Sequence, residues 1–176
     1  MTTTLDASRY SVMETLRDGS QIEIRALKPI DRDALRGAVD RMSDESIQRR
    51  FFAPKRHFSE REIDYFLNVD FVNHVALVVV LNADGRALVV GGGRYIVTEP
   101  GIAEVAFGLD DAHQGRGIGA LLLKHLTALA RAAGLEKFTA EVLGGNASML
   151  KVFEKSGLAL STKREAGVIH VTLQLT

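Results

Sequence analysis

The sequence of 176 residues predicts an α/β (α+β) fold with a mostly antiparallel sheet. Three strand patterns follow one another as a meander between residues 74 and 110, separated by turn signals at Asp84-Gly85 and Glu99-Pro100-Gly101. A glycine cluster and a strongly apolar helical pattern come next, over residues 115–133. Further strand and helix patterns fill residues 137–175 and end in an antiparallel pair. Together these observations indicate a sheet with intervening helices.

A hairpin precedes the meander. Asp18-Gly19 is a strong hairpin signal between strand patterns at residues 11–17 and 21–27. Residues 1–10 carry no periodic pattern, so we expect them to be loose. One domain over residues 11–176 is long enough to bury a substantial core.

Three short helices are expected between the hairpin and the meander. Asp31 can cap the first helix. Ser43 can start the second, which Pro54 would end. Ser59 and Glu62 form a capping box for the third.

The second half of the chain alternates helices and strands. The expected elements are a helix at 117–133 ended by Gly134, a strand at 137–143, a helix at 146–156 capped by Asn146, and strands at 158–164 and 168–175. The triplet Gly91-Gly92-Gly93 inside the second strand of the meander indicates a bulge or a close neighbour on that face.

The amino-acid composition excludes several classes of function. Lys+Arg 22 and Asp+Glu 22 balance, which argues against nonspecific nucleic-acid binding. The absence of cysteine removes disulfides, thiolate catalysis and cysteine-type zinc sites. The histidines show no metal-ligand spacing, and no G-x-S-x-G motif supports a serine hydrolase. No signal pattern opens the sequence and no apolar run is long enough to cross a bilayer, so we expect a soluble cytoplasmic protein that needs no metal.

The glycine cluster is the most informative stretch of the sequence. Gly115, Gly117 and Gly119 fall where a helix begins, although glycine is a poor helix former. A missing Cβ leaves room for a ligand to approach the backbone. The first amides of a helix lack internal partners and lie at the positive end of its dipole, which makes them an anion site. Because no Ser, Thr, Asp or Asn directly precedes Ile118, we infer that a bound phosphate caps these amides.

Several interpretations compete for this cluster. It lacks the Lys-Ser/Thr pair of an NTP-binding loop. Residues 115–120 satisfy G-x-G-x-x-A, as in dinucleotide-binding folds, but residues 110–114 separate them from the strand, and the upstream strands are antiparallel. Gln114, Gly117 and Gly119 also form the pattern Gln-x-x-Gly-x-Gly. A glycine-rich turn without a ligand is the remaining alternative.

The Gln-x-x-Gly-x-Gly pattern resembles the loop that holds the pyrophosphate of acetyl-coenzyme A (acetyl-CoA) in the GNAT N-acetyltransferases. Residues 146–158 resemble a later motif of that family, with Asn146 and Phe153 in register. Residues 103–107 and 43–52 are similar to the bacterial protein-lysine acetyltransferase branch. The resemblance implies a strongly twisted seven-strand sheet with helices on both faces.

The resemblance also implies where acetyl-CoA binds. The strand at 102–110 would splay from the strand at 137–143, leaving backbone groups that a pantetheine arm completes like an added strand. Arg116 would add charge beside the phosphates unless it is merely solvated, and Asn146 would cap its helix or also contact the pantetheine arm. The residues expected to bind the coenzyme are Phe107, Gly108, Leu109, Gln114, Gly115, Arg116, Gly117, Ile118, Gly119, Ala120, Asn146 and Phe153.

Glu104 is the candidate catalytic base, because the similar branch carries its catalytic glutamate at this position. It shares a strand face with Ala106 and Gly108, and burial there would raise its pKa and make it a better base. A glutamate on a solvated strand face is the alternative. The sequence departs from many GNAT enzymes at Phe153, where they carry a tyrosine that protonates the leaving thiolate.

We therefore expect an N-acetyltransferase that moves an acetyl group from acetyl-CoA to a primary amine, with a protein lysine among the candidate acceptors. It would act as a monomer or homodimer without nucleic-acid or membrane partners. The alternatives are a non-catalytic acyl-CoA-binding module and, with less support, a nucleotide-binding oxidoreductase. The acceptor site should come from residues 30–75. One interpretation is that a cluster of aromatic and basic residues there lines an acceptor groove, but we expect the aromatic residues in the core and the basic residues on the surface: Phe51, Phe52, Phe58, Arg49, Arg50, Lys55 and Arg56.

Overall fold

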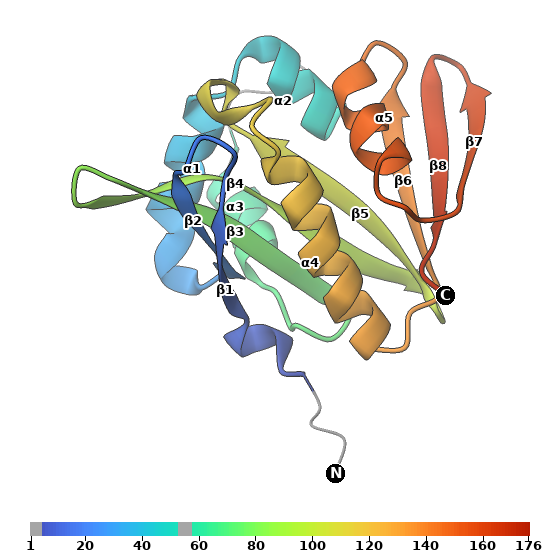
Figure 1. Ribbon diagram of the computed structural model, residues 1–176, viewed down its shortest axis with the longest axis horizontal. Helices are drawn as coiled ribbons and strands as arrows, with labels where there is room; N and C mark the ends of the chain where they lie inside the picture. The colour runs from blue at the N-terminus through green and yellow to red at the C-terminus, as the bar shows by residue number, and fades with distance from the viewer. Residues whose placement is uncertain (1–4, 53–57) are drawn as a thin grey trace.

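Eight strands form one sheet in the computed structural model, which describes residues 5–52 and 58–176 (Figure 1). The spatial order is β1-β2-β3-β4-β5-β6-β8-β7, and every neighbouring pair is antiparallel except β5 and β6. The strands are β1 (Ser11–Thr15), β2 (Gln21–Ala26), β3 (His74–Ala83), β4 (Arg86–Glu99), β5 (Ile102–Leu109), β6 (Lys137–Leu143), β7 (Leu160–Glu165) and β8 (Val168–Gln174). The mostly antiparallel sheet is thus confirmed, with one strand more than the seven we expected.

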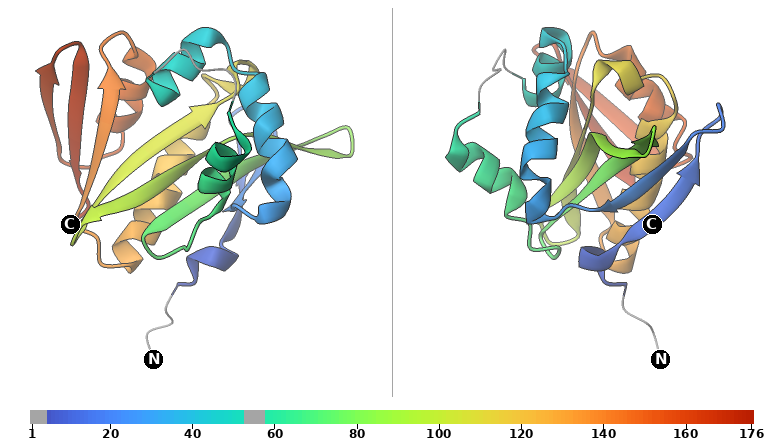
Figure 2. Two further views of the ribbon diagram at one scale, coloured as in Figure 1. Left: turned by 180° about the vertical axis from the view of Figure 1, so that it is seen from behind. Right: turned by 90° about the vertical axis from the view of Figure 1, so that its left-hand side faces the viewer.

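Helices cover both faces of the sheet, as expected. They are α1 (Arg32–Asp40), α2 (Asp44–Phe51), α3 (Glu60–Leu67), α4 (Ile118–Ala132) and α5 (Ala147–Glu154), with short 3-10 turns η1 (Ala7–Arg9), η2 (Pro29–Asp31) and η3 (Asp111–His113). Helices α1, α2 and α3 lie on one face, and α4 lies on the other (Figure 2). Within the described part of the chain, no helix has the length and apolar character needed to cross a membrane.

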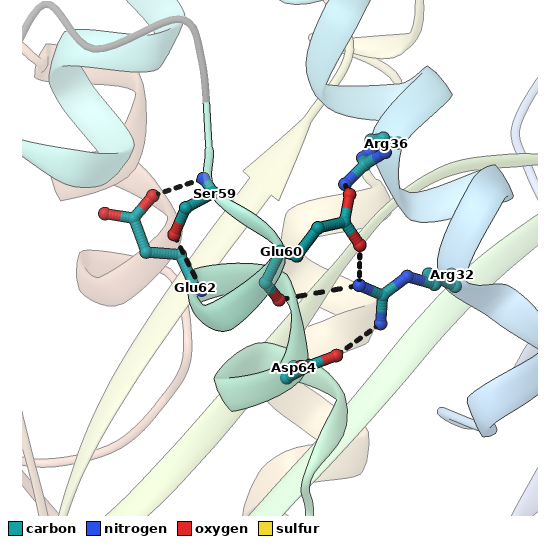
Figure 3. Close-up of polar contacts among 6 residues, drawn as sticks. All are labelled: Arg32, Arg36, Ser59, Glu60, Glu62 and Asp64. Carbon is teal, nitrogen blue, oxygen red and sulfur yellow. Dashed lines mark hydrogen bonds and ion pairs between the residues drawn. The ribbon is translucent and has the colours of Figure 1, made fainter.

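Two of the three expected helix caps before the meander are present. The Ser43 hydroxyl accepts the N–H of Ser46 at 3.1 Å at the start of α2. Ser59 and Glu62 form the capping box of α3, in which each side chain accepts the other residue's backbone N–H (Figure 3). Pro54, expected to end α2, lies outside the described residues.

The expected cap of α1 by Asp31 is wrong. The Asp31 carboxylate accepts two hydrogen bonds from the guanidinium of Arg25, at 2.8 and 2.7 Å, and one from the N–H of Lys28 at 2.7 Å. These three hydrogen bonds occupy the Asp31 carboxylate, which therefore makes no capping hydrogen bond to the first turn of α1. A bidentate arginine is a stronger partner for a carboxylate than a helix N–H, because both groups of the pair are charged.

The N-terminal segment is more ordered than we expected. Residues 7–9 form η1, and the Tyr10 hydroxyl hydrogen-bonds the ring of His125 on α4 at 2.6 Å. The carbonyl of Tyr10 also accepts the N–H of Ala26 at 2.9 Å. The described end of the segment that we expected to be loose is therefore held against both the sheet and α4.

The glycine triplet of β4 permits a close approach of three strands, and the sheet carries a bulge beside it. The register between β3 and β4 shifts between Val79 and Val80. A Cβ on Gly91 would lie 2.2 Å from the carbonyl oxygen of Gly108, and one on Gly92 would lie 2.3 Å from that of Leu77. Any larger residue would collide with backbone that cannot rotate away, so the prediction of a bulge or a close neighbour is confirmed.

The sheet opens between β5 and β6, its one parallel pair. Strands β5 and β6 pair only through Ile102–Glu104 and Lys137–Thr139, and then they diverge (Figure 1). On its other side, β5 stays paired with β4 as far as Leu109. The expected splay is thus present, and the N-terminus of α4 lies at the open end (Figure 1).

Candidate active site

The open edge of β5 is the first component of the candidate site. From residue 105 to residue 109, this strand has a partner on the β4 side and none on the β6 side, among the residues that the structure describes. Backbone N–H and C=O groups at such an edge need partners, and an extended ligand can supply them in the manner of an added strand.

The tip of α4 is the second component. Gly117 precedes the helix with φ 86°, and no side chain in the described part of the chain caps the first turn. Gly115 has φ 74°, so both glycines adopt the left-handed conformation that other residues reach only with strain. A Cβ at either position would meet nothing within 4 Å, so the loop faces open space. Uncapped amides at a helix N-terminus are groups that can bind an anion.

Two polar side chains of the loop serve to hold it in place. The amide nitrogen of Gln114 donates to the Ser46 hydroxyl at 3.0 Å and to the Leu109 carbonyl at 3.1 Å, which ties the loop to α2 and β5. Arg116 is turned toward the β1–β2 hairpin, where it donates to Asp18 at 2.5 Å and to the Ser20 hydroxyl at 3.0 Å. Hydrogen bonds from Ser20 and then from Arg116 lower the pKa of Asp18. Arg116 is therefore neither free nor merely solvated in this structure.

The end of β5 is anchored by a buried carboxylate. Asp110 is 1% exposed, and it accepts a hydrogen bond from Nε of Arg41 at 3.0 Å and another from the ring of His113. The next carboxylate, Asp111, accepts the N–H of Ser43 at 2.9 Å. These contacts fix the loop to α1 and α2, which lie on the opposite face of the sheet from α4.

The remaining predicted coenzyme residues border the gap from α4 and α5. Asn146 caps α5 by accepting the N–H of Met149 at 3.3 Å, so this part of its expected role is confirmed. The rings of Phe107 and Phe153 lie 6.1 Å apart and are buried, so they pack in the core beneath the gap. Of the other residues of the helix tip, Ile118 is buried, Gly119 is half-buried and Ala120 is exposed.

Glu104 lies at the fork of the two strands, opposite Thr139 in the last β5–β6 pair. It points to the same face as Ala106 and Gly108, but it is exposed. The burial that we expected for this side chain is therefore absent. The negative charge of Glu104 acts on Arg50, whose pKa it raises against the larger effect of burial.

Two arginines lie near Glu104 on this face: Arg50, which the sequence indicated as one alternative for an acceptor groove, and Arg94, which it did not indicate. The side-chain carbons of Arg50, from α2, pass 3.4 Å from where a Cβ on Gly108 would be, and its guanidinium lies 4.8 Å above the ring of Phe51. Arg94, on β4, is the register partner of Ala106. Both are half-buried, so the expectation that basic residues here lie on the surface is wrong for Arg50.

Arg94 is held by residues from two other elements. Its Nη1 donates to the carbonyl of Phe66 at 3.0 Å and lies 3.0 Å from Nε2 of His74, while its guanidinium lies 5.1 Å from the centre of the Phe66 ring. Burial and the neighbouring Arg94 lower the pKa of His74 to about 4, so this imidazole is neutral at pH 7 and accepts the hydrogen bond. Burial, together with Arg50, lowers the pKa of Arg94 to about 9.

A cavity of about 70 Å³ lies between this face and helices α1, α2 and α3. Its floor is the glycine-rich part of β4 and β5, and its walls are apolar side chains of the three helices. Among the residues that the structure describes, the cationic groups that line it are Arg50 and Arg94. In the described ranges, no group of three or more His, Asp or Glu side chains is placed to hold a metal ion.

The outer wall of this region is fixed by ion pairs between α1 and α3 (Figure 3). Arg32 binds Asp64 at 2.5 Å and also binds Glu60, which in turn binds Arg36. These contacts hold α3 against α1, and α3 carries the Phe66 carbonyl and ring that hold Arg94.

The comparisons with known proteins agree with this geometry. A sequence model of the acetyltransferase (GNAT) family matches residues 40–158. Acetyltransferase PA5475 of Pseudomonas aeruginosa is 30% identical over 138 residues, which cover 78% of this chain and 74% of that protein. Acetyltransferase Pat of Mycolicibacterium smegmatis is 31% identical over 157 residues, which cover 88% of this chain and 46% of that protein. The chain therefore spans about half the length of this second relative.

Solved structures show the same fold. The GNAT domain of S. lividans PAT superimposes with a TM-score of 0.84 at 35% identity, covering 93% of this chain and 96% of that chain. A cAMP-binding acyltransferase from Mycobacterium smegmatis has a TM-score of 0.65 at 27% identity and covers 97% of this chain but 48% of its own.

Proposed function

This chain belongs to the GNAT acetyltransferase family, whose members use acetyl-CoA, and on that premise we propose that it transfers the acetyl group of acetyl-CoA to a primary amine by direct attack in a ternary complex. The observation that carries the proposal is the divergence of β5 from β6 beside the uncapped tip of α4. A ligand with an extended amide-bearing arm and a diphosphate matches these two features at once.

The donor site would use mostly backbone groups. The diphosphate would bind the amides of the loop from Gln114 to Ala120, where Gly115 and Gly117 provide the left-handed turns and Gly119 leaves the first helical turn bare. The pantetheine arm would pair with the free edge of β5 at Phe107, Gly108 and Leu109. Asn146, which caps α5, would border this arm, and Phe153 would support the gap from below.

Glu104 would act as the general base. A lysine-type amine has a pKa near about 10.4, so it needs to lose a proton before it attacks a thioester. Glu104 stands at the fork where the thioester would emerge, is exposed to an incoming amine, and would accept the proton directly or through water. N–H groups of β5 near the thioester would polarise its carbonyl. Because Phe153 has no hydroxyl, the departing thiolate would take its proton from solvent.

The test of this mechanism is Glu104→Gln, with Glu99→Gln as the matched control because Glu99 is exposed at the end of the neighbouring strand. Glu104→Gln should keep the acetyl-CoA affinity measured by calorimetry and lower kcat by about 10²–10⁴-fold. Unchanged turnover would remove Glu104 from the mechanism, and no calorimetric affinity of the unmodified protein for acetyl-CoA would remove the donor site.

The lack of a hydroxyl at Phe153 favours a second candidate, an acyl-CoA-binding module without turnover. The same assay separates the two functions, because coenzyme A release is followed over a panel of amines and lysine-bearing proteins. Acetyl-CoA binding without coenzyme A release from any of them would support the second candidate.

A further inference from the structure

Arg50 and Arg94 are two neighbouring positive charges, which the charge of Glu104 offsets only in part by favouring the charged form of Arg50. Among residues 5–52 and 58–176, neither guanidinium forms an ion pair with a carboxylate, whereas Arg25, Arg32 and Arg41 each do. The charge of Arg50 also disfavours a charge on Arg94, whose pKa it lowers. Half-buried cations without a carboxylate in contact cost free energy, which an anionic ligand would recover.

The two guanidiniums face a space that can hold such a ligand. Both line the cavity of about 70 Å³, whose other walls are largely apolar. One water needs roughly 10–15 Å³ of such volume, so the cavity admits several atoms of a small apolar group. Arg94 uses Nη1 for the Phe66 carbonyl and the His74 ring, and its other nitrogens have no hydrogen-bond partner in the described part of the chain. They remain available for a bidentate contact with a carboxylate.

We propose that Arg50 and Arg94 bind the carboxylate of the acceptor, so that the acceptor is a small amine carrying a carboxylate and an apolar side chain, as in an amino acid. This inference rests on the proposed function, because Glu104 is the group that receives the amine. Residues two apart on a strand face are about 7 Å apart, and Arg94 faces Ala106, the residue two positions from Glu104. One small molecule would therefore place its carboxylate at the two arginines and its amine, a few bonds away, at Glu104.

The reaction leaves the carboxylate unchanged. The amine nitrogen bonds to the carbonyl carbon of the thioester, the carbon–sulfur bond breaks, and coenzyme A departs as a thiolate. The proton lost by the amine goes to Glu104 and then to solvent, while the thiolate takes up a proton from solvent. The products are an N-acetylamino acid and coenzyme A.

The experiment compares amino acids that have apolar side chains with their own amides, which keep the amine and the side chain but lack the negative charge. The unmodified protein should show a kcat/KM at least about tenfold higher for the acids, as expected for charge-assisted hydrogen bonds. Arg94→Gln and Arg50→Gln should bring this ratio close to one, and Arg94→Lys should restore part of it. Arg49→Gln is the matched control, because Arg49 is the next residue on α2 and pairs with Glu45 at 2.6 Å instead of lining the cavity. It should keep the ratio of the unmodified protein.

A second measurement does not depend on turnover. Binding of 4-methylpentanoate and of its amide is followed by NMR in the absence of acetyl-CoA, with circular dichroism to confirm that each variant is folded. The carboxylate should bind the unmodified protein and Arg49→Gln more tightly than Arg94→Gln or Arg50→Gln, and the amide should show no such difference.

The outcomes separate this inference from the proposed function. Equal acetylation of acids and amides, or arginine variants that keep the preference for acids, would overturn the carboxylate site while leaving acetyl transfer in place. Carboxylate binding that depends on Arg94 and Arg50, without coenzyme A release from any amine, would support the site and contradict the transferase. Acetylation confined to lysine-bearing proteins would overturn the small-molecule acceptor.

Discussion

The two sides of β5 are built differently. On the α4 side, the candidate donor site consists of backbone groups: the free edge of the strand and the amides at a glycine-rich helix tip, all between residues 105 and 120. On the α1–α3 side, the candidate acceptor site consists of side chains from four elements, with Arg50 on α2, Phe66 on α3, Arg94 on β4 and Glu104 on β5.

This difference indicates how each side can vary. A backbone site demands particular conformations, so glycines at left-handed positions determine it and most other side chains matter little. A side-chain site depends on which residues reach one face, so a single substitution can change what it binds while the fold remains the same. We therefore expect the donor side to respond to changes of conformation, and the acceptor side to changes of charge.

The largest expected effect on the acceptor side comes from His74. It is 9% exposed, and its pKa is lowered to about 4, so the unfolded chain binds its proton more readily than the folded one. The groups facing it are Arg94 on β4, Tyr65 on α3 and Asp70 before β3. Its neutral form therefore supports the fold above pH 6.5, and this stability is lost as pH falls toward about 4.

Over that window, the loss should reach about 3 kcal/mol. His74→Gln keeps an acceptor for Arg94 but cannot take up a proton, so the variant should lose less stability between pH 7 and pH 4.5 than the unmodified protein. Urea unfolding at both values measures this. Parallel pH profiles for the two proteins would show that His74 does not titrate in this window.

The next effect concerns Arg41, which hydrogen-bonds the carboxylate of Asp110 at the end of β5. Arg41 donates to the buried Asp110 at 3.0 Å and to the Val89 carbonyl at 2.6 Å, so Arg41→Gln leaves a buried carboxylate with one partner fewer. We expect a loss of about 2 kcal/mol in the free energy of unfolding. Arg36→Gln on α1 is the control and should lose much less, because Arg36 binds the exposed Glu60 and not a buried carboxylate. A loss that is equal in both variants would mean that Asp110 is adequately held by His113 alone.

Smaller effects should distinguish the glycines at the tip of α4. Gly117→Ala forces a Cβ into a left-handed residue with φ 86° and should cost about 1 kcal/mol. Gly119→Ala lies inside the helix, where its Cβ would meet Val152 at an ordinary 3.5 Å, and should stabilise the fold by about 0.5–1 kcal/mol.

Both glycine variants should nevertheless weaken acetyl-CoA binding severalfold, as measured by calorimetry, because both change the surface offered to the diphosphate. A gain in stability with unchanged affinity at Gly119 would show that its missing Cβ serves no ligand. That result would limit the donor site to Gly115, Gly117 and the strand edge.

The local structure of the candidate donor side could be predicted from the sequence because its features depend on neighbouring residues. Left-handed glycines before an apolar helix and an asparagine at a helix start are recognisable from neighbouring residues alone, and the structure places Gly115, Gly117 and Asn146 accordingly. The strand patterns located all the strands, although the family resemblance implied seven rather than the eight that are present. Asp31 was misjudged because its partner Arg25 lies on another element, so no local pattern shows their pairing.

The acceptor side was largely hidden from the sequence. Arg94 stands between Gly93 and Tyr95 in a strand, and its partners Phe66 and His74 are 28 and 20 residues away. Arg49 and Arg50 are adjacent and alike in the sequence, yet only the position of α2 over Gly108 decides which of them lines the cavity. Glu104 was placed on the correct face, but its exposure depends on where the covering helices end. Such facts follow from packing between distant segments, which local patterns do not encode.

The smallest expected effect tests whether the acceptor side depends on exposed charges as well as half-buried ones. Glu60 is 68% exposed and binds Arg32 and Arg36 across the α1–α3 contact (Figure 3). Exposed ion pairs contribute little and are screened by salt, so Glu60→Gln should lower Tm slightly at low salt and not at about 1 M salt. Glu154→Gln, at the exposed end of α5, is the control. Since α3 carries the Phe66 groups that hold Arg94, a marked loss of 4-methylpentanoate binding in Glu60→Gln alone would mean that this outer ion-pair network, and not only the cavity, sets the position of Arg94.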